Sequence, residues 1–393
     1  MLYLRWSETV RRFADKPAIH DGGAVITFAD LASAVDASPR TSVPVIARSG
    51  NVSFFVEILR AWRDGQAVIP VEKDAPEPVL QRAPLEDTRL VKYTPGATGV
   101  PRGIFLRAAQ VIADADHLVA AMGLTPEVPN LGVISLSHSY GFSNVVLPLL
   151  LHGVPVHLVP VPFPRVVEEA FQKHEAMVVP AVPSMWRAWQ RSGMLKSAPI
   201  RLALSAGAPL ALSLEQEVFE SAGLKIHNFY GASECGGVAW DDSMTPRESA
   251  GLLGKPLHGV DVECGRDGRF SIHSDAVATC YDAPRADDVL GGGSYLTRDI
   301  GFIDENGNLH LTSTIGGAIN VAGRKVSPAK VEAAIFSTGL VRRVEVFAVP
   351  SSDPERHEEI AARVELVEGV SLDALKSATS KALQGWEMPR QWR

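Results

Sequence analysis

LGVISLS at Leu131–Ser137, AMVVPAV at Ala176–Val182 and IRLALSA at Ile200–Ala206 are three short apolar runs in the middle of the chain. Each run is bounded by turn residues, which is typical of a buried β-strand. Helical patterns lie between the runs. Because fully apolar strands that alternate with helices form parallel sheets covered on both faces, the sequence predicts an α/β fold.

The predicted helices lie at about Arg165–His174, Ser184–Ser192 and Ser213–Ala222. The third begins with a pattern typical of a capping box, in which the Ser213 hydroxyl would accept a hydrogen bond from a backbone N–H of the first turn. Gly223 follows it directly and predicts a left-handed helix end.

The composition excludes several classes of protein. The chain has 393 residues, of which 46% are hydrophobic and 21% charged, so it is neither disordered nor a small disulfide-stapled domain. A formal net charge of −7 argues against a general nucleic-acid binder or a basic membrane-surface protein.

We expect a cytoplasmic protein that does not enter the membrane. The N-terminal residues lack the uninterrupted apolar stretch of a secretory signal. Prolines and histidines interrupt the most apolar segment, Val145–Pro164, so it does not predict a membrane span. Cys235, Cys264 and Cys280 show no metal-ligand spacing, and so few cysteines suggest a reducing compartment.

The pattern changes near residue 300. Gly301–Ser313 predicts a hairpin that turns at Asn306–Gly307, and we interpret its Asp and Asn residues as turn formers rather than calcium ligands. Ser327–Pro328 predicts a helix start, with serine as the N-cap. Two apolar segments and another helix follow, at Val344–Val349, Ile360–Val367 and Ser371 to about Leu383. We therefore expect a large domain over residues 1–314 and a small α/β domain over 315–393.

The segment YTPGATGVPRGI (Tyr93–Ile104) is rich in glycine and threonine and precedes a helical pattern that begins at about Ala108. Glycines allow backbone N–H groups to point into a phosphate-sized hollow, and Thr98 and Arg102 would add a donor and a positive charge. An ordinary surface loop is the alternative for this segment taken alone.

Two further segments carry polar residues at the predicted ends of strands. In NFYGASECGG (Asn228–Gly237), Glu234 could hold Mg²⁺ and Tyr230 offers a flat face to a base, although a solvated strand-end loop is the alternative. In YLTRDIGFIDENGNL (Tyr295–Leu309), Asp299 could accept hydrogen bonds from two vicinal hydroxyls, or could cap a turn.

Taken together and in this order, these segments resemble the adenylate-forming superfamily of acyl-CoA synthetases, peptide-synthetase adenylation domains and luciferases. The three segments are similar to that family's YTSGTTGxPKG, YGxTExG and TGDxG motifs. LSAGAPL (Leu204–Leu210) and INVAGRKVSPAKVE (Ile319–Glu332) are similar to its SGGAPL and IKxxGxKVxPxEVE. The resemblance implies a large domain of layered α/β sheets that binds ATP and an acid, followed by a small C-terminal lid.

The resemblance also implies an activity. Such enzymes use ATP and Mg²⁺ to convert a carboxylic acid into an acyl-adenylate, and most then transfer the acyl group to the thiol of CoA or of a carrier-protein pantetheine. It assigns Thr94, Gly96, Thr98, Gly99 and Arg102 to the β- and γ-phosphates, Tyr230 to the adenine, Ser233 to the α-phosphate, Glu234 to Mg²⁺ and Asp299 to the ribose hydroxyls. It assigns His138, Ser139, Tyr140, Ala206, Gly207 and Gly231 to the acid pocket, with a hydrogen-bonded core histidine as the alternative for His138. Catalysis would rest on Thr98, Arg102, Glu234 and His138.

Several positions depart from the family pattern. Pro95 replaces a serine and removes a backbone donor, and Arg102 replaces the usual lysine. Ser313–Gly317 lacks the ATP-contacting arginine and the hinge side chain of the family. The sequence stops at Arg393, before the motif with the lysine that assists adenylation, and Lys325 or Lys330 could substitute.

These departures leave three functions open. The first is an AMP-producing acid–thiol ligase, with an aryl or fatty acid as substrate because SLSHSYGFS (Ser135–Ser143) lacks an aspartate for an amino group. The second is an ATP-independent acyltransferase on the same scaffold. The third is a non-catalytic protein that binds a nucleotide or an acyl group.

Overall fold

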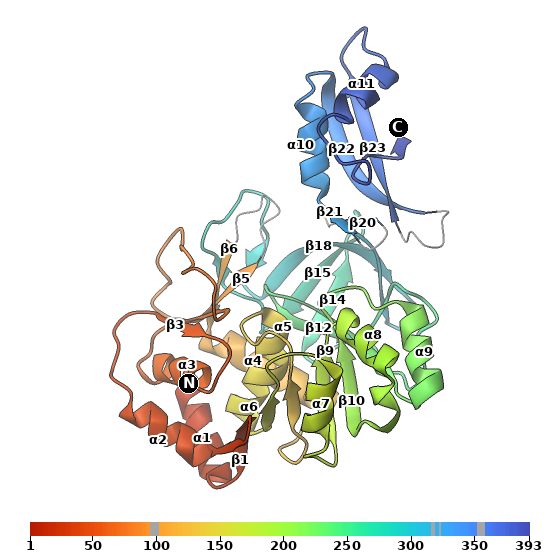
Figure 1. Cartoon of the computed structure of the whole chain (residues 1–393). Helices are drawn as coiled ribbons and strands as arrows, with labels where there is room; N and C mark the ends of the chain where they lie inside the picture. The colour runs from red at the N-terminus through yellow and green to blue at the C-terminus, as the bar shows by residue number, and fades with distance from the viewer. Residues whose placement is uncertain (95–101, 316–318, 322–323, 352–357) are drawn as a thin grey trace.

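The structure is a computed structural model that describes residues 1–94, 102–315, 319–321, 324–351 and 358–393 (Figure 1). In this described part, the largest sheet has 14 strands, in the order β14-β15-β18-β19-β13-β12-β11-β10-β9-β7-β8-β1-β2, with β17 paired to β18. Neighbouring strands are parallel from β11 through β10, β9, β7 and β8 to β1. The half of the sheet beyond β11 is antiparallel, as is the edge pair β1–β2.

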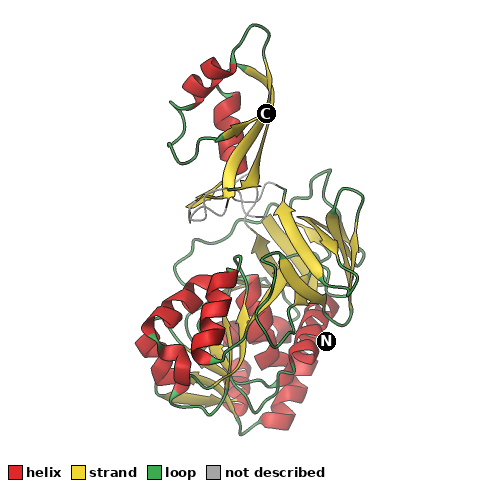
Figure 2. Cartoon of the chain, turned by 90° about the vertical axis from the view of Figure 1, so that its right-hand side faces the viewer, coloured by secondary structure: helices red, strands yellow, loops and turns green. Residues whose placement is uncertain are grey.

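Two helix layers cover the parallel half of this sheet, on opposite sides (Figure 2). Helices α7 (Pro164–Phe171), α8 (Pro183–Ser192) and α9 (Leu212–Ala222) share one apolar core with the sheet. Helices α1 (Leu2–Phe13) and α6 (Leu147–His152) contribute to a second core. The strands between are β1 (Pro17–Asp21), β7 (Asn130–Gly132), β8 (Val156–Leu158), β9 (Met177–Ala181), β10 (Ile200–Ser205) and β11 (Ile226–Ala232). The predicted α/β fold is confirmed.

The strands beyond β11 form the antiparallel half of the sheet. Its strands are β12 (Gly236–Trp240), β13 (Leu252–Pro256), β14 (Val260–Cys264), β15 (Arg269–Ser274), β17 (Leu290–Gly291), β18 (Ser294–Ile303) and β19 (Leu309–Thr314). The predicted hairpin is the β18–β19 pair. Gly307 has φ +80° at its turn, and the Asp304 carboxylate accepts hydrogen bonds from the backbone N–H groups of Asn306 and Asn308. The turn interpretation of these residues is therefore confirmed.

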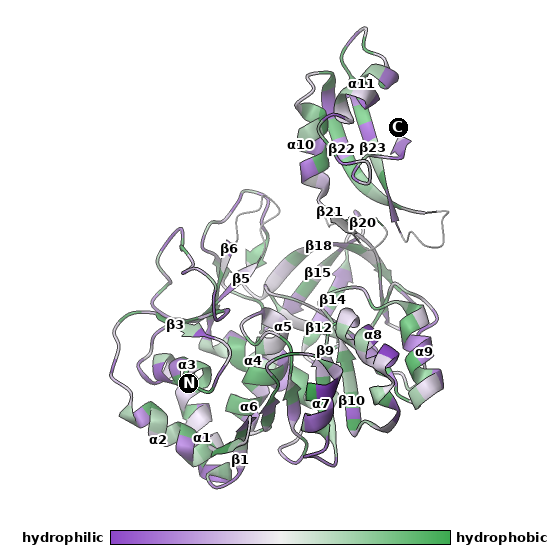
Figure 3. Ribbon diagram, in the orientation of Figure 1, coloured by the Kyte–Doolittle hydropathy of each residue, from purple (hydrophilic) through white to green (hydrophobic). Residues whose placement is uncertain are grey.

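A second sheet has the order β16-β6-β5-β4-β3, with four strands from the N-terminal third of the chain and β16 from residues 280–281. Its strands are β3 (Val45–Arg48), β4 (Val68–Val71), β5 (Thr88–Thr94), β6 (Arg102–Arg107) and β16 (Cys280–Tyr281). The surrounding elements are β2 (Ala24–Thr27), α2 (Phe28–Ala37), α3 (Ser53–Arg63), α4 (Ala108–Met122), α5 (Ser139–Gly141), the π-helical turn Phe142–Val146 and the 3₁₀ turn Met194–Ser197. Figure 3 shows the inner helices α4 and α6 as largely hydrophobic and the outer helix α7 as largely hydrophilic.

The C-terminal unit has its own apolar core, built from residues between Ile319 and Leu383. Its elements are β20 (Ile319–Val321), β21 (Arg324–Val326), α10 (Pro328–Phe336), β22 (Val341–Pro350), β23 (Glu358–Leu366), α11 (Leu372–Thr379) and β24 (Gln391–Trp392). The Ser327 hydroxyl accepts from the Lys330 N–H, as its N-cap position predicts. A separate core is consistent with a small domain, and the boundary at residue 314 stays a prediction.

Some local expectations differ from the structure. Helix α9 is capped by Ala211 without a side-chain hydrogen bond, so the predicted capping box at Ser213 is wrong, whereas Gly223 has the expected left-handed φ of +63°. The first predicted strand is shorter than expected because β7 ends at Gly132. All three cysteines are free. Within the described residues, we find no helix with the length and apolarity needed to span a bilayer.

Candidate active site

A cavity of about 430 Å³ lies where β10 and β11 of the parallel sheet end and the antiparallel half begins. Ligands of open α/β sheets bind outside the carboxyl ends of the strands, so this is the expected place for a site. The lining includes eight residues that the sequence assigned to nucleotide or acid: Ser139, Tyr140, Ala206, Gly207, Tyr230, Gly231, Ser233 and Asp299.

Tyr230 and Asp299 are joined at one end of the cavity. The Tyr230 hydroxyl donates to Asp299 Oδ2 at 2.5 Å, and the Thr314 hydroxyl donates to Oδ1 at 2.5 Å. Burial, together with the neighbouring Asp299 charge, raises the pKa of Tyr230 well above its usual value, so the phenol is a donor at neutral pH. A carboxylate has about four lone-pair positions, so Asp299 can still accept from two further hydroxyls.

Helix α5 and the loop after β10 also contribute to the lining of the cavity. The Ser139 hydroxyl donates to Ser233 Oγ at 2.6 Å, which ties α5 to the turn after β11. The Tyr140 ring stacks on Phe229 with centroids 5.9 Å apart, and its hydroxyl donates to the Leu204 carbonyl at 3.2 Å. Gly207 has φ +80°, a backbone conformation that few other residues adopt, so a glycine is favoured there.

A buried charged cluster that the sequence did not reveal lies against this cavity. Lys92 of β5 donates to the Ser143 hydroxyl at 3.1 Å and lies 3.6 Å from the Asp114 carboxylate. Ser143, which lines the cavity, donates to Asp114 at 2.6 Å, and Asp114 also accepts from the Gly237 N–H at 3.0 Å. A lysine directly after the apolar pair Leu90–Val91 of β5 was the available signal for this cluster.

Glu234 and Arg102 belong to a second group of contacts, and neither lines the cavity as the described residues define it. Glu234 is 7% exposed and accepts from the Tyr281 hydroxyl at 2.9 Å. Burial raises its pKa above the usual value for glutamate. The Arg102 guanidinium lies 3.6 Å from the centre of the Tyr281 ring and forms a two-point ion pair with Asp288. Arg102 is therefore bonded to protein groups where the sequence predicted phosphate.

The predicted phosphate loop connects β5 to β6. Thr94 and Arg102 are register partners at the ends of these two strands, so the structure places the loop's two ends side by side. Gly96, Thr98 and Gly99 lie outside the described residues, as do Pro95 and Gly316–Gly317 of the predicted hinge. Their assignments stay predictions.

His138 does not line the cavity as the described residues define it. Its side chain is 73% exposed and lies 3.6 Å from the Glu72 carboxylate, which also accepts from the hydroxyls of Ser49 and Ser137 at 3.0 and 2.9 Å. His138 thus lies beside the acid pocket, on a surface held by hydroxyl–carboxylate contacts, and it is not the core histidine of the alternative interpretation.

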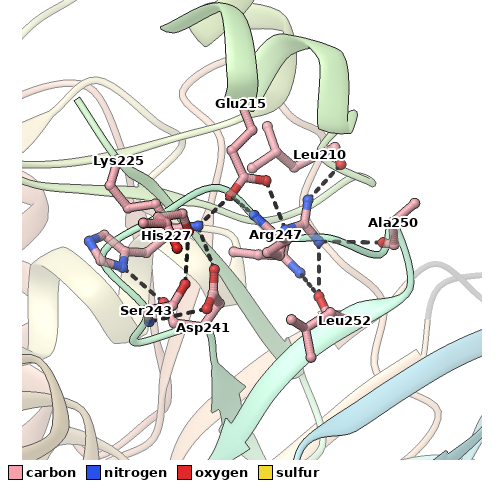
Figure 4. Close-up of polar contacts among 11 residues, drawn as sticks. Leu210, Glu215, Lys225, His227, Asp241, Ser243, Arg247, Ala250 and Leu252 are labelled. Atoms are coloured by element: carbon pink, nitrogen blue, oxygen red, sulfur yellow. Dashed lines mark hydrogen bonds and ion pairs between the residues drawn. The ribbon is translucent and has the colours of Figure 1, made fainter. Parts of the chain in front are cut away.

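A network of buried charges includes Arg247, which lines the cavity (Figure 4). Glu215 of α9 pairs with Lys225 and with the Arg247 Nε, the latter at 2.9 Å, and Lys225 also pairs with Asp241 at 2.5 Å. Arg247 lines the cavity, and its other N–H groups donate to the carbonyls of Leu210 and Leu252 at 2.8 and 2.9 Å. Two acids and two bases cancel in charge, and they fix the loop that carries Arg247 to the sheet.

The lysines proposed as substitutes belong to the C-terminal unit. Lys330 pairs with Glu387 of the same unit at 2.6 Å. Lys325 lies on β21, and its side chain is outside the described part of the structure. Lys330 is therefore held by a contact within its own unit.

The sequence profile of the family described as AMP-binding enzyme matches residues 48–268, which is more than half of the chain. The chain therefore belongs to this family. It is 24% identical over 329 residues to the long-chain-fatty-acid–CoA ligase of Bacillus subtilis and 27% identical over 324 residues to a feruloyl-CoA synthase of Amycolatopsis. These alignments cover 79% and 78% of this chain but only 58% and 65% of the two relatives.

Solved structures support the fold. ATP-bound MatB from Rhodopseudomonas palustris matches with a TM-score of 0.70 at 18% identity, covering 100% of this chain and 94% of the other. The o-succinylbenzoate CoA synthetase MenE from Bacillus subtilis matches with a TM-score of 0.72 at 18% identity, covering 99% and 93%. The fold is thus that of adenylate-forming enzymes.

Proposed function

We propose that this protein is an acid–thiol ligase that uses ATP to convert an aryl or fatty acid into an acyl-adenylate and then passes the acyl group to a thiol. The observation that carries the proposal is the cavity in which Tyr230, Asp299, Ser139 and Ser233 converge, in a member of the AMP-binding enzyme family. Residues far apart in the sequence supply a flat ring, a carboxylate and hydroxyls to one hollow.

The nucleotide would lie at the Tyr230 end of the cavity. Asp299 is held by Tyr230 and Thr314, so its orientation is fixed before a ligand arrives. Its remaining lone pairs would accept hydrogen bonds from the two ribose hydroxyls, and the Tyr230 ring would face the adenine. Ser233, already hydrogen-bonded to Ser139, would donate to the α-phosphate.

The acid would lie at the other end, against Tyr140, Ala206, Gly207 and Gly231. Here the ring of Tyr140 and small residues leave room for an apolar group, and among the described residues that line the cavity we find no carboxylate at this end to bind a substrate amine. The substrate's carboxylate oxygen would attack the α-phosphorus, forming the acyl–phosphate bond and releasing pyrophosphate.

Glu234 is the carboxylate that would hold Mg²⁺. Carboxylate oxygens are the ligands that Mg²⁺ prefers, and the Tyr281 hydroxyl already orients this group. When bound, Mg²⁺ would offset the negative charge of the polyphosphate. Nearby, Arg102 supplies a cation that lowers the pKa of Glu234 and so favours its ionised form.

The acceptor would be the thiol of CoA or of a carrier-protein pantetheine. The thiolate would attack the acyl carbonyl, form a thioester and release AMP. Relatives of this chain are named as CoA ligases or as a CoA synthase, which favours CoA as the first acceptor to test.

A specific observation favours a second candidate function. Arg102 is paired with Asp288 and stacked on Tyr281, so its charge is already balanced without a phosphate. An acyltransferase that moves an activated acyl group between thiols would not need that cation.

Acid-dependent exchange of radiolabelled pyrophosphate into ATP tests the proposal. The purified chain is assayed with Mg²⁺ and a panel of aryl and fatty acids of increasing size. We expect exchange with at least one acid and thioester formation when CoA is added. Acyl transfer from a thioester without exchange for any acid would exclude the ligase in favour of the acyltransferase.

A further inference from the structure

Three histidines from distant parts of the sequence converge on the far side of the parallel sheet from α6. His20 of β1 and His157 of β8 are register partners on adjacent parallel strands, so their side chains leave the same face of the sheet. His174 follows α7, the helix that covers that face. His157 Nδ1 and His174 Nε2 are 2.8 Å apart, and one nitrogen from each of the three rings lies within 4.8 Å of the others.

The rings are arranged around a common point. His20 and His157 stack with centroids 5.6 Å apart and planes inclined by 8°. His174 meets each of them edge-on, with centroids 5.0 Å away in both cases. Two parallel rings and one perpendicular ring present nitrogen atoms toward one small volume.

We propose that His20, His157 and His174 bind a zinc-class divalent transition metal ion, separate from the active-site cavity. Imidazole nitrogens suit Zn²⁺, Cu²⁺ and Ni²⁺ and are poor ligands for Mg²⁺. Zinc bonds to imidazole are about 2.0–2.1 Å long, so tetrahedral ligand nitrogens lie about 3.3 Å apart. The observed separations need only side-chain adjustment to reach that spacing.

The surroundings favour neutral, ligand-competent imidazoles. Burial lowers the pKa of His157 to about 4, and burial also lowers the pKa values of His20 and His174. The nearby Lys173 ammonium acts in the same direction, although its charge would also repel a metal ion. Lys173 donates to the Gly22 carbonyl at 3.2 Å and is exposed, so solvent screens that repulsion.

A fourth coordination position is available. His20 and His174 line a cavity of about 300 Å³ that is distinct from the active-site cavity. Three histidines with one open position are a known zinc arrangement, in which water or a substrate supplies the fourth ligand. The ion would also join β1, β8 and the end of α7, so we expect it to stabilise the N-terminal edge of the large sheet.

Zinc titration of the full chain, freed of any histidine tag and stripped with a chelator, tests the site. Calorimetry should give one Zn²⁺ per chain, and Co²⁺ should give the strong visible absorption of a tetrahedral site. His20→Ala and His174→Ala should each weaken Zn²⁺ binding by at least about ten-fold, the scale on which zinc-site changes act. The melting temperature should rise with Zn²⁺ in the wild type and not in these variants.

Two matched variants complete the test. His258→Ala removes an exposed histidine outside the cluster and should leave Zn²⁺ affinity unchanged. Lys173→Gln removes the nearby positive charge and should leave the affinity equal or tighter. The absence of saturable Zn²⁺ binding, or equal affinity in wild type, His20→Ala and His174→Ala chains that retain native circular dichroism, would overturn the proposal.

Discussion

The buried position of Glu234 disfavours the charged form of its carboxyl group. Glu234 is 7% exposed, and burial raises its pKa above the ordinary value of 4.5, although the Tyr281 hydroxyl and the Arg102 charge oppose that shift. A carboxyl whose pKa is raised on folding stabilises the protein at low pH and loses that contribution as the pH rises through the raised value. We infer that this loss of stability at neutral pH is retained because the Glu234 carboxylate would bind Mg²⁺.

Glu234→Gln should therefore gain stability while it loses activity. The amide keeps an oxygen that accepts from Tyr281 but carries no charge, so at about pH 7 the variant should be more stable by on the order of 1 kcal/mol. The gain should shrink toward zero near about pH 4, where the wild-type carboxyl becomes neutral. Denaturant unfolding at both pH values measures this, and pyrophosphate exchange should fall by at least about ten-fold. A variant that is less stable at neutral pH would contradict this account.

At the residue scale, the sequence predicted which residues belong to the site but not which of them contact one another. Tyr230 and Asp299 were each predicted to be nucleotide ligands, yet their hydrogen bond joins residues 69 positions apart. Lys92 was missed because its partners Asp114 and Ser143 lie on other elements, and no local pattern reports such pairing. The same limit applies to Arg102, whose residue type suggested phosphate and whose carboxylate partner, Asp288, is 186 positions away.

At the scale of elements, α9 is fixed to the sheet by charge as well as by apolar packing. Glu215 is fully buried and bonds to Lys225 and Arg247 (Figure 4). Lys225 directly precedes β11, and Arg247 lies in the loop before β13. Removal of one partner from a buried ion pair leaves an uncompensated charge and typically costs about 3–5 kcal/mol.

Glu215→Gln should consequently destabilise the chain by roughly 3 kcal/mol, because Lys225 then keeps only the Asp241 carboxylate and Arg247 keeps only carbonyl partners. Glu217→Gln, at an exposed position of the same helix, is the matched control and should change the stability by less than about 0.5 kcal/mol. Thermal and urea unfolding of both variants measure the difference. Equal destabilisation would mean that the network does not hold α9.

The helix ends were predicted best where a glycine or a capping serine marks them in the sequence. Gly223 ends α9 and Ser327 caps α10 as expected, because both act through local backbone geometry. The predicted capping box at Ser213 is wrong because the helix begins one residue earlier, at Leu212, so Ala211 occupies the N-cap position. The strand expected to run to Ser137 ends at Gly132, and the following serines turn toward Glu72 instead.

At the scale of the whole molecule, the cavity depends on the joining of two sheet types. The parallel half contributes Tyr230 at the end of β11, and the antiparallel half contributes Asp299 on β18. The sequence predicted the α/β half from its apolar runs and the β18–β19 hairpin from its turn, but periodicity does not report that the two halves form one continuous sheet. The family resemblance identified the motifs from their order, and the fold brings Tyr230 and Asp299 of two of these motifs to one cavity.

The measurement that tests the account most directly is calorimetric binding of ATP with Mg²⁺ to three chains: the wild type, Asp299→Asn and Asp267→Asn. Asp267 is an exposed turn residue and serves as the control. Saturable binding should weaken by roughly 10- to 100-fold in Asp299→Asn, because hydrogen bonds to a charged group contribute about 1.5–3 kcal/mol. Asp267→Asn should bind as the wild type does. Equal affinity in all three chains, or no saturable binding to the wild type, would contradict a nucleotide site between Tyr230 and Asp299.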